Sequence, residues 1–166
     1  EPAAHVSEAD VIILNTCSVR EKVVQKVYAR LGEIKRYKAL RKDIVVGVAG
    51  CMPQLEKDRI LKRAPFVNIL AGPQKGHIMG HLVHLSETAH EPVVDMRSEE
   101  APSPLETPYI QRGSSWRAGL TISEGCNRQC AFCVVPLTRG KERVRCSTDI
   151  LSEVKDLPAS CRPTAK

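Results

Sequence analysis

Short apolar runs alternate with helical patterns through the first half of the chain, and this alternation most limits the possible fold. The runs at residues 11–14, 44–49 and 67–71 are typical of buried strands. Apolar spacing of three to four residues predicts helices from about Ser18 to Leu40, over 55–63 and over 75–86. Helices between parallel strands form crossovers, which are almost always right-handed. The sequence therefore predicts an α/β unit whose parallel strands all end at one sheet edge.

Two cysteines follow two of these predicted strands directly. Cys17 comes after the first strand, and Cys51 comes after the second. Ligands in open α/β sheets bind at the edge where the strands end, so both thiols are expected on one binding edge. Cysteine is also a common small buried residue, so position alone leaves a packing role equally open. Ser18 precedes Glu21 by three positions, which is the capping-box spacing for a helix start.

The composition fits a globular protein with thiol chemistry. The chain has 166 residues, of which 42% are hydrophobic and 27% charged, and its longest apolar run, 44–52, is far too short to span a membrane. Its seven cysteines are an odd number, which disfavours a disulfide framework and favours metal or thiolate chemistry. A formal net charge of +6 agrees with an acidic partner such as nucleic acid.

The periodic pattern stops in a segment punctuated by prolines. Residues 90–115 contain Pro92, Pro102, Pro104 and Pro108, and they are expected to link two domains. A second unit opens with a strand candidate over 118–123 and ends in a helix over 148–157.

The strongest motif is a cysteine triplet between those two elements. Cys126, Cys130 and Cys133 follow a CxxxCxxC spacing. Three close thiolates suit a [4Fe–4S] cluster with one iron left open. Structural zinc sites usually use four ligands in pairs, and the nearest upstream histidine is His90, so iron–sulfur is favoured over zinc.

These motifs together resemble the radical S-adenosylmethionine methylthiotransferases. The resemblance rests on the CxxxCxxC triplet and on five segments that occur in the family's order: NTCSVREK at 15–22, GC at 50–51, GPQ at 72–74, TISEGCN at 121–127 and CVVPLTRG at 133–140. Within the family, NTCSVREK is most similar to members that modify tRNA, rather than to those that act on ribosomal protein S12.

The resemblance implies a fold and a set of cofactors. Residues 1–89 would form the N-terminal cluster domain without its first strand and helix, 90–115 the linker, and 116–166 the truncated start of a partial (β/α)6 radical barrel. Cys126, Cys130 and Cys133 would hold the [4Fe–4S] cluster that binds S-adenosyl-L-methionine and generates a radical from it. Cys17 and Cys51 would be two of three ligands of an auxiliary [4Fe–4S] cluster, whose remaining cysteine has no counterpart here.

The resemblance also implies an activity. Such an enzyme adds a methylthio group to C2 of an N6-isopentenyladenosine next to the tRNA anticodon. It would be a cytoplasmic, monomeric protein without membrane attachment. Because the chain carries only the beginning of the barrel, it is expected to be inactive by itself. The alternatives are a methylthiotransferase for ribosomal protein S12 and a non-catalytic iron–sulfur or RNA-binding remnant.

Other candidates carry weaker signals. His77, His81 and His84 share one face of a predicted helix, but without an acidic partner they are expected to be exposed or at the core edge. Cys146 and Cys161 are expected to be ordinary thiols. The cluster loop is basic, and its cations are expected to meet tRNA phosphates; they are Arg128, Arg139, Lys141, Arg143 and Arg145.

Overall fold

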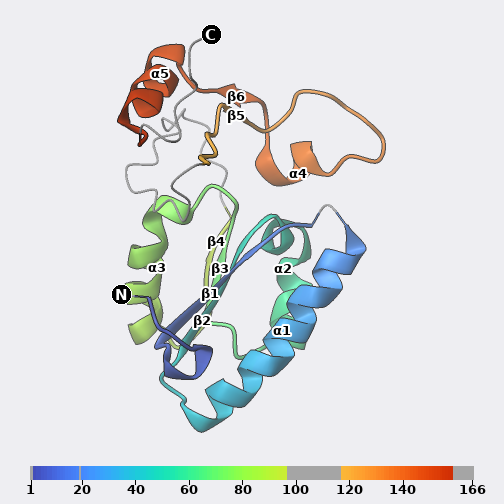
Figure 1. Cartoon of the computed structure of the whole chain (residues 1–166). Helices are drawn as coiled ribbons and strands as arrows, with labels where there is room; N and C mark the ends of the chain where they lie inside the picture. Colours follow the sequence, from blue (N-terminus) through green and yellow to red (C-terminus); the bar gives the residue numbers. More distant parts are fainter. Residues whose placement is uncertain (1, 19, 97–116, 159–166) are drawn as a thin grey trace.

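The computed structural model describes residues 2–18, 20–96 and 117–158. The first part holds a 3-10 turn η1, four strands and three helices around a sheet, and the second holds two short strands and two helices (Figure 1). The elements are η1 (Val6–Glu8), β1 (Val11–Thr16), α1 (Glu21–Leu40), β2 (Val45–Gly50), α2 (Cys51–Arg63), β3 (Ile69–Ala71), the 3-10 turn η2 (Gly76–Ile78), α3 (Met79–Thr88), β4 (Val93–Asp95), β5 (Ser123–Glu124), α4 (Val135–Arg139), β6 (Arg143–Val144) and α5 (Ser147–Asp156).

The central sheet is parallel, as the sequence predicts. Its strand order is β1-β2-β3-β4, and every neighbouring pair is parallel. The strand β4 was not predicted, because it lies within the segment 90–115 that was expected to be a linker. Ile69 of β3 pairs with Val93 of β4, so the sheet extends beyond the boundary expected at residue 89. The rest of that segment, from residue 97, lies outside the described residues.

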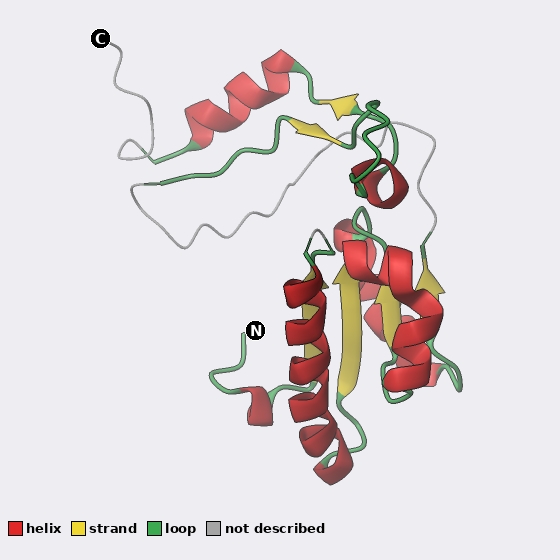
Figure 2. Ribbon diagram, turned by 90° about the vertical axis from the view of Figure 1, so that its right-hand side faces the viewer, coloured by secondary structure: helices red, strands yellow, loops and turns green. Residues whose placement is uncertain are grey.

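Helices cover both faces of the sheet, and the two faces have separate cores. On one face, Leu31 of α1 and Ile60 of α2 pack with Val46 and Val48 of β2. On the other face, Leu82 of α3 packs with strand residues such as Ile69. Figure 1 shows the sheet between α3 on its left and α1 and α2 on its right, and Figure 2 looks onto the side of α1 and α2. Both faces of β2 and β3 are buried, which is typical of parallel strands covered on both sides.

The connection from β3 to β4 through α3 differs from the two crossovers that the sequence predicts. The strands advance in one direction across the sheet, yet α3 lies on the face opposite to α1 and α2. The connection through α3 must therefore have the opposite hand to the first two. The physical reason is burial: α1 and α2 already fill one face, and the second face needs cover of its own.

Two helix starts also differ from the prediction. The N-cap of α1 is Arg20, without a side-chain capping bond, so Ser18 does not form the expected capping box. The hydroxyl of Ser18 is buried and has no hydrogen-bond partner among the described residues. Helix α2 begins at Cys51, four residues before the expected start, and its backbone breaks from helical geometry at Glu56.

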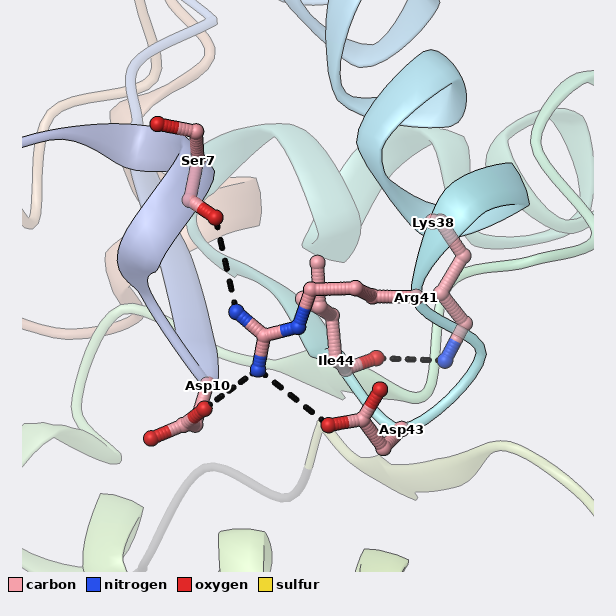
Figure 3. Close-up of polar contacts among 6 residues, drawn as sticks. All are labelled: Ser7, Asp10, Lys38, Arg41, Asp43 and Ile44. Carbon is pink, nitrogen blue, oxygen red and sulfur yellow. Dashed lines mark hydrogen bonds and ion pairs between the residues drawn. The ribbon is translucent and has the colours of Figure 1, made fainter.

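Arg41 connects the segments that lead into β1 and β2 by hydrogen bonds. Arg41, at the end of α1, donates hydrogen bonds to the carboxylates of Asp10 and Asp43 and to the carbonyl of Ser7 (Figure 3). The ammonium of Lys38 donates to the carbonyl of Ile44. Asp10 and Ile44 directly precede β1 and β2, so these bonds hold the starts of the two strands in place. The two cysteines lie at the opposite edge of the sheet, where the strands end.

The second part of the chain is small and antiparallel. Of the strand expected at 118–123, only Ser123 lies in β5, which pairs antiparallel with β6. No parallel barrel strand occurs within residues 117–158, since β5 has only this short antiparallel neighbour there. The helix expected at 148–157 is confirmed as α5, Ser147–Asp156. In the part of the chain that the structure describes, no helix has both the length and the apolar character to cross a membrane.

Candidate functional site: two sets of cysteines at the sheet edge

Cys17 and Cys51 lie at the same edge of the parallel sheet, as the sequence predicts. The last residues of β1 and β2, Thr16 and Gly50, are register partners, and each cysteine follows directly. The Thr16 hydroxyl donates a hydrogen bond to the Ala49 carbonyl at 2.7 Å, which joins the two strand ends. Cys17 is exposed, whereas Cys51 is only 5% exposed.

Gly50 makes the direct passage from β2 into α2 possible. Its φ of 100° and ψ of −154° fall in a region that is essentially restricted to glycine. A Cβ at this position would lie 2.2 Å from the Thr16 carbonyl oxygen. The absent side chain therefore lets α2 begin immediately, which places Cys51 in its first turn at the strand end.

A buried ion pair lies at the ends of β3 and β4. The sequence analysis did not predict it. The Lys75 ammonium lies 3.5 Å from the Asp95 carboxylate, and both side chains are almost completely buried. The Gly72 amide also donates to the Asp95 carbonyl at 2.8 Å. Asp95 falls in the segment expected to be a linker, so the sequence pattern carried no signal that would pair it with Lys75.

The cysteine triplet forms a loop between β5 and α4. The Cys126 amide donates to the Gly140 carbonyl at 3.1 Å, and the Cys133 amide donates to the Cys130 carbonyl at 3.0 Å. At the start of the loop, Gly125 has a φ of 77°, and a Cβ there would lie 2.1 Å from the Lys141 carbonyl oxygen. The start of the motif is thus held against residues 140–141, which follow α4.

The thiols of this loop fit an iron–sulfur cluster in kind and number. Cys126 and Cys133 are half-buried, and Cys130 is exposed. Three thiolates with a hydrogen-bond donor near one sulfur, the Arg128 amide at 3.4 Å from Cys126 Sγ, are the donor set that such clusters use. Within the described ranges, however, no three cysteine, histidine or acidic side chains already converge as a metal site. The three thiols therefore have the chemistry that a cluster needs, but the loop would have to bring their sulfur atoms closer together to bind one.

Arg139 brings the loop and the sheet edge together. Helix α4 packs against α2, above the strand ends (Figures 1 and 2). The Arg139 carbonyl accepts a hydrogen bond from Gln74 Nε2 at 3.1 Å. The neighbouring Cys51 side chain, as the largest cause, raises the pKa of the Arg139 guanidinium above its usual value.

The basic residues of the loop are not all available to a ligand. Arg143 pairs with Glu124 at 3.0 Å, and Arg145 forms an ion pair with Glu153; all four of these side chains are largely buried. These two arginines thus hold the second part of the chain together, contrary to the expectation that the whole set meets phosphates. Arg128 and Lys141 remain exposed.

The weaker candidates stay outside the site. His77, His81 and His84 are exposed, as expected. Cys146 is exposed, and its sulfur lies 3.0 Å from the Thr148 hydroxyl, a hydrogen bond that lowers the pKa of the thiol. Cys161 lies outside the described residues.

Comparisons with known proteins confirm the resemblance. Residues 1–72 match the family model described as "Uncharacterized protein family UPF0004". Over most of its length the chain is also similar to curated proteins named tRNA-2-methylthio-N(6)-dimethylallyladenosine synthase. It is 42% identical over 159 residues to the protein of Hydrogenobaculum sp. (strain Y04AAS1), covering 95% of this chain and 36% of that relative. It is 43% identical over 150 residues to that of Photobacterium profundum, covering 90% of this chain and 31% of the relative. The chain thus spans about a third of the length of these relatives.

Proposed function

We propose that this chain is the part of a tRNA methylthiotransferase that carries its two sets of cysteine ligands. The whole enzyme adds a methylthio group to C2 of N6-isopentenyladenosine next to the anticodon. One observation carries the proposal: the part of the chain with the cysteine triplet lies against the sheet edge that holds Cys17 and Cys51, because α4 packs on α2 and the Arg139 carbonyl accepts a hydrogen bond from Gln74. The names of the two relatives, which are 42% and 43% identical to this chain over the aligned residues, support the same reaction.

In this proposal Cys126, Cys130 and Cys133 hold one [4Fe–4S] cluster, and Cys17 and Cys51 hold part of a second. The first cluster, when bound, supplies an electron for radical cleavage of S-adenosyl-L-methionine. Three thiolates leave one iron open for that cofactor. The second site combines a buried thiol, Cys51, with an exposed one, Cys17. The protein works in the cytoplasm as a monomer.

The RNA substrate is expected to meet the exposed cations of the loop. Arg128 lies between Cys126 and Cys130, and the backbone of Lys141 lies next to Gly125, just before the triplet. Neither residue is part of the ion pairs formed by Arg143 and Arg145. Phosphate contacts of this kind orient a nucleic acid without reading its sequence. The proposal therefore assigns the recognition of the modified adenosine to the rest of the enzyme.

A chimeric enzyme tests the function directly. Residues 1–166 replace the matching third of the Hydrogenobaculum relative, and the chimera is expressed in bacteria that lack this methylthiolation. We expect mass spectrometry of the digested tRNA to show the methylthio nucleoside. The same chimera with Cys126→Ala should give none, whereas Cys146→Ala, a cysteine outside the site, should retain the product.

Two results would contradict the proposal. A chimera that folds and takes up iron but yields no methylthio nucleoside would show that this segment does not support the reaction. Multiple-turnover product from the 166-residue chain alone would show that the rest of the enzyme is not needed. A radical reaction must be shielded from water and its substrate must be held in place, so the isolated chain is expected to give no product.

A further inference from the structure

The positive charge of the chain is concentrated on one face of the sheet. Helices α1 and α2 together carry ten lysines and arginines against four aspartates and glutamates, which gives them a formal charge of +6. The whole chain has the same formal charge of +6, so the cations and anions of all its other residues balance. Helix α3, on the opposite face, has one glutamate and neither lysine nor arginine. The two helix layers therefore differ strongly in charge.

Helices α1 and α2 lie side by side and form one continuous surface (Figure 2). Tyr28 of α1 donates a hydrogen bond to the Glu56 carboxylate of α2 at 2.8 Å, and the Arg63 guanidinium of α2 lies 3.9 Å from the centroid of the Tyr28 ring. A 20-residue helix such as α1 is about 30 Å long. The cations of both helices are thus spread over one surface, which begins at the edge where the strands end.

Most of these cations are free to meet a ligand. Arg30 and Arg59 form ion pairs with glutamates of their own helices, and Lys38 donates to the Ile44 carbonyl. Six others are exposed and have no hydrogen-bond or ion-pair partner within residues 2–18, 20–96 and 117–158; they are Lys22, Lys26, Lys35, Arg36, Lys57 and Lys62. We call these six residues the basic face.

The chemistry around the basic face favours the phosphates of a nucleic acid over other anionic partners. Tyr28 and Tyr37 of α1 pack against the core and α2 has no aromatic residue, so these helices offer no exposed ring for stacking on bases. The apolar side of α1 is covered by the sheet and cannot enter a membrane interface. A protein partner usually needs large apolar anchors, and the two helices expose only Leu40 and Leu55 of that kind. Backbone phosphates need cations alone.

We propose that the basic face binds the sugar–phosphate backbone of the tRNA substrate. The inference deepens the proposed function, on which it rests for the identity of the RNA. Helix α4 packs against α2, so the exposed cations of the triplet loop lie near the end of the basic face at the sheet edge. Phosphate contacts hold a nucleic acid without reading its sequence, so the basic face orients the tRNA whatever its bases.

Fluorescence anisotropy of labelled tRNA, measured with the full 166-residue chain at several salt concentrations, tests the basic face. Each lost phosphate contact should lower the affinity roughly tenfold at about 50 mM salt, and it should make the plot of log affinity against log salt shallower by about 0.7–0.9. Lys22→Ala combined with Lys26→Ala should therefore raise Kd roughly 10- to 100-fold. The pair Lys57→Ala with Lys62→Ala on α2 should do the same. Alanine favours a helix, so the circular dichroism spectrum should stay unchanged.

The matched control makes the same change in net charge on the opposite face. Lys22→Ala with Lys26→Ala lowers the formal charge from +6 to +4, and so does His81→Glu with His84→Glu on α3. Both histidines are exposed. Because the salt dependence reports phosphates in contact with the protein, the α3 pair should leave its slope unchanged.

Three results would overturn the inference. The first is a wild-type chain that does not bind tRNA at low salt, or lysine pairs that leave both Kd and the slope unchanged. The second is an equal loss in the α3 control, which would point to net charge rather than to this face. The third is equally tight binding of poly-L-glutamate at the same concentration of charges, which would indicate an acidic protein partner instead of RNA.

The binding assay and the chimera fail independently. Binding requires neither a cluster nor turnover, so a chimera without product would contradict the proposed function and leave the RNA contact in place. Lysine pairs that bind tRNA like the wild type would contradict the basic face alone and leave the reaction untouched.

Discussion

Two glycine-to-alanine substitutions should change stability in opposite directions. Gly50 has a φ of 100°, and a Cβ there would lie 2.2 Å from the Thr16 carbonyl oxygen. Backbone strain of this kind costs about 1–3 kcal/mol, and forcing an atom into a packed site costs about 1–3 kcal/mol more. Gly50→Ala should therefore lower the free energy of unfolding by about 2–6 kcal/mol. Such a loss is a large fraction of the typical total of about 5–15 kcal/mol.

Gly32 provides the matched control. It lies inside α1, and an added Cβ would meet nothing within 4 Å. Gly32→Ala should raise the free energy of unfolding by about 0.5–1 kcal/mol, because alanine restricts the unfolded chain more and favours the helix. Urea unfolding of the whole chain, followed by far-ultraviolet circular dichroism, measures both values. A Gly50→Ala variant as stable as the wild type would refute the backbone geometry at the end of β2.

Three further predictions concern buried contacts. Partial burial, as the larger cause, and the hydrogen bond to Glu56 raise the pKa of Tyr28 from the ordinary value of 10.0 to about 12. The neutral phenol therefore stabilises the fold below pH 10, and this stability is lost between about pH 10 and 12. Tyr28→Phe should remove this alkaline step from a profile of unfolding free energy against pH. Asp95→Ala leaves the buried ammonium of Lys75 without its carboxylate and should cost about 3–5 kcal/mol in urea unfolding, unlike a surface pair. Ile60→Ala opens a cavity under α2 and should cost about 2–5 kcal/mol; a loss below about 1 kcal/mol in the same assay would contradict its place in the core.

The sequence predicted the parallel sheet and the shared edge of Cys17 and Cys51 because both follow from local patterns. Apolar runs followed by helical spacing fix the strand–helix order, and parallel pairing then brings the strand ends together. It missed β4 because Val93 and Val94 form too short a run among prolines to stand out. That strand is held by pairing with β3, which is a tertiary effect.

The hydrogen bond between Gln74 and the Arg139 carbonyl could not be predicted for a similar reason. Arg139 appeared only as one of several cations in a basic loop, and nothing local relates it to a glutamine 65 positions earlier in the chain. The same holds for Arg143 and Arg145, whose acidic partners come from neighbouring elements. Charge composition predicted a basic loop, whereas packing decided which of its cations remain exposed.

Iron content and electron paramagnetic resonance after anaerobic reconstitution test the central claim most directly. The chain should turn brown, and reduction should give a [4Fe–4S] signal that depends on the triplet. Cys126→Ala, Cys130→Ala or Cys133→Ala should each remove most of that signal, while Cys146→Ala should keep it. Stoichiometric zinc without iron uptake, or a cluster signal that survives Cys126→Ala unchanged, would contradict the claim.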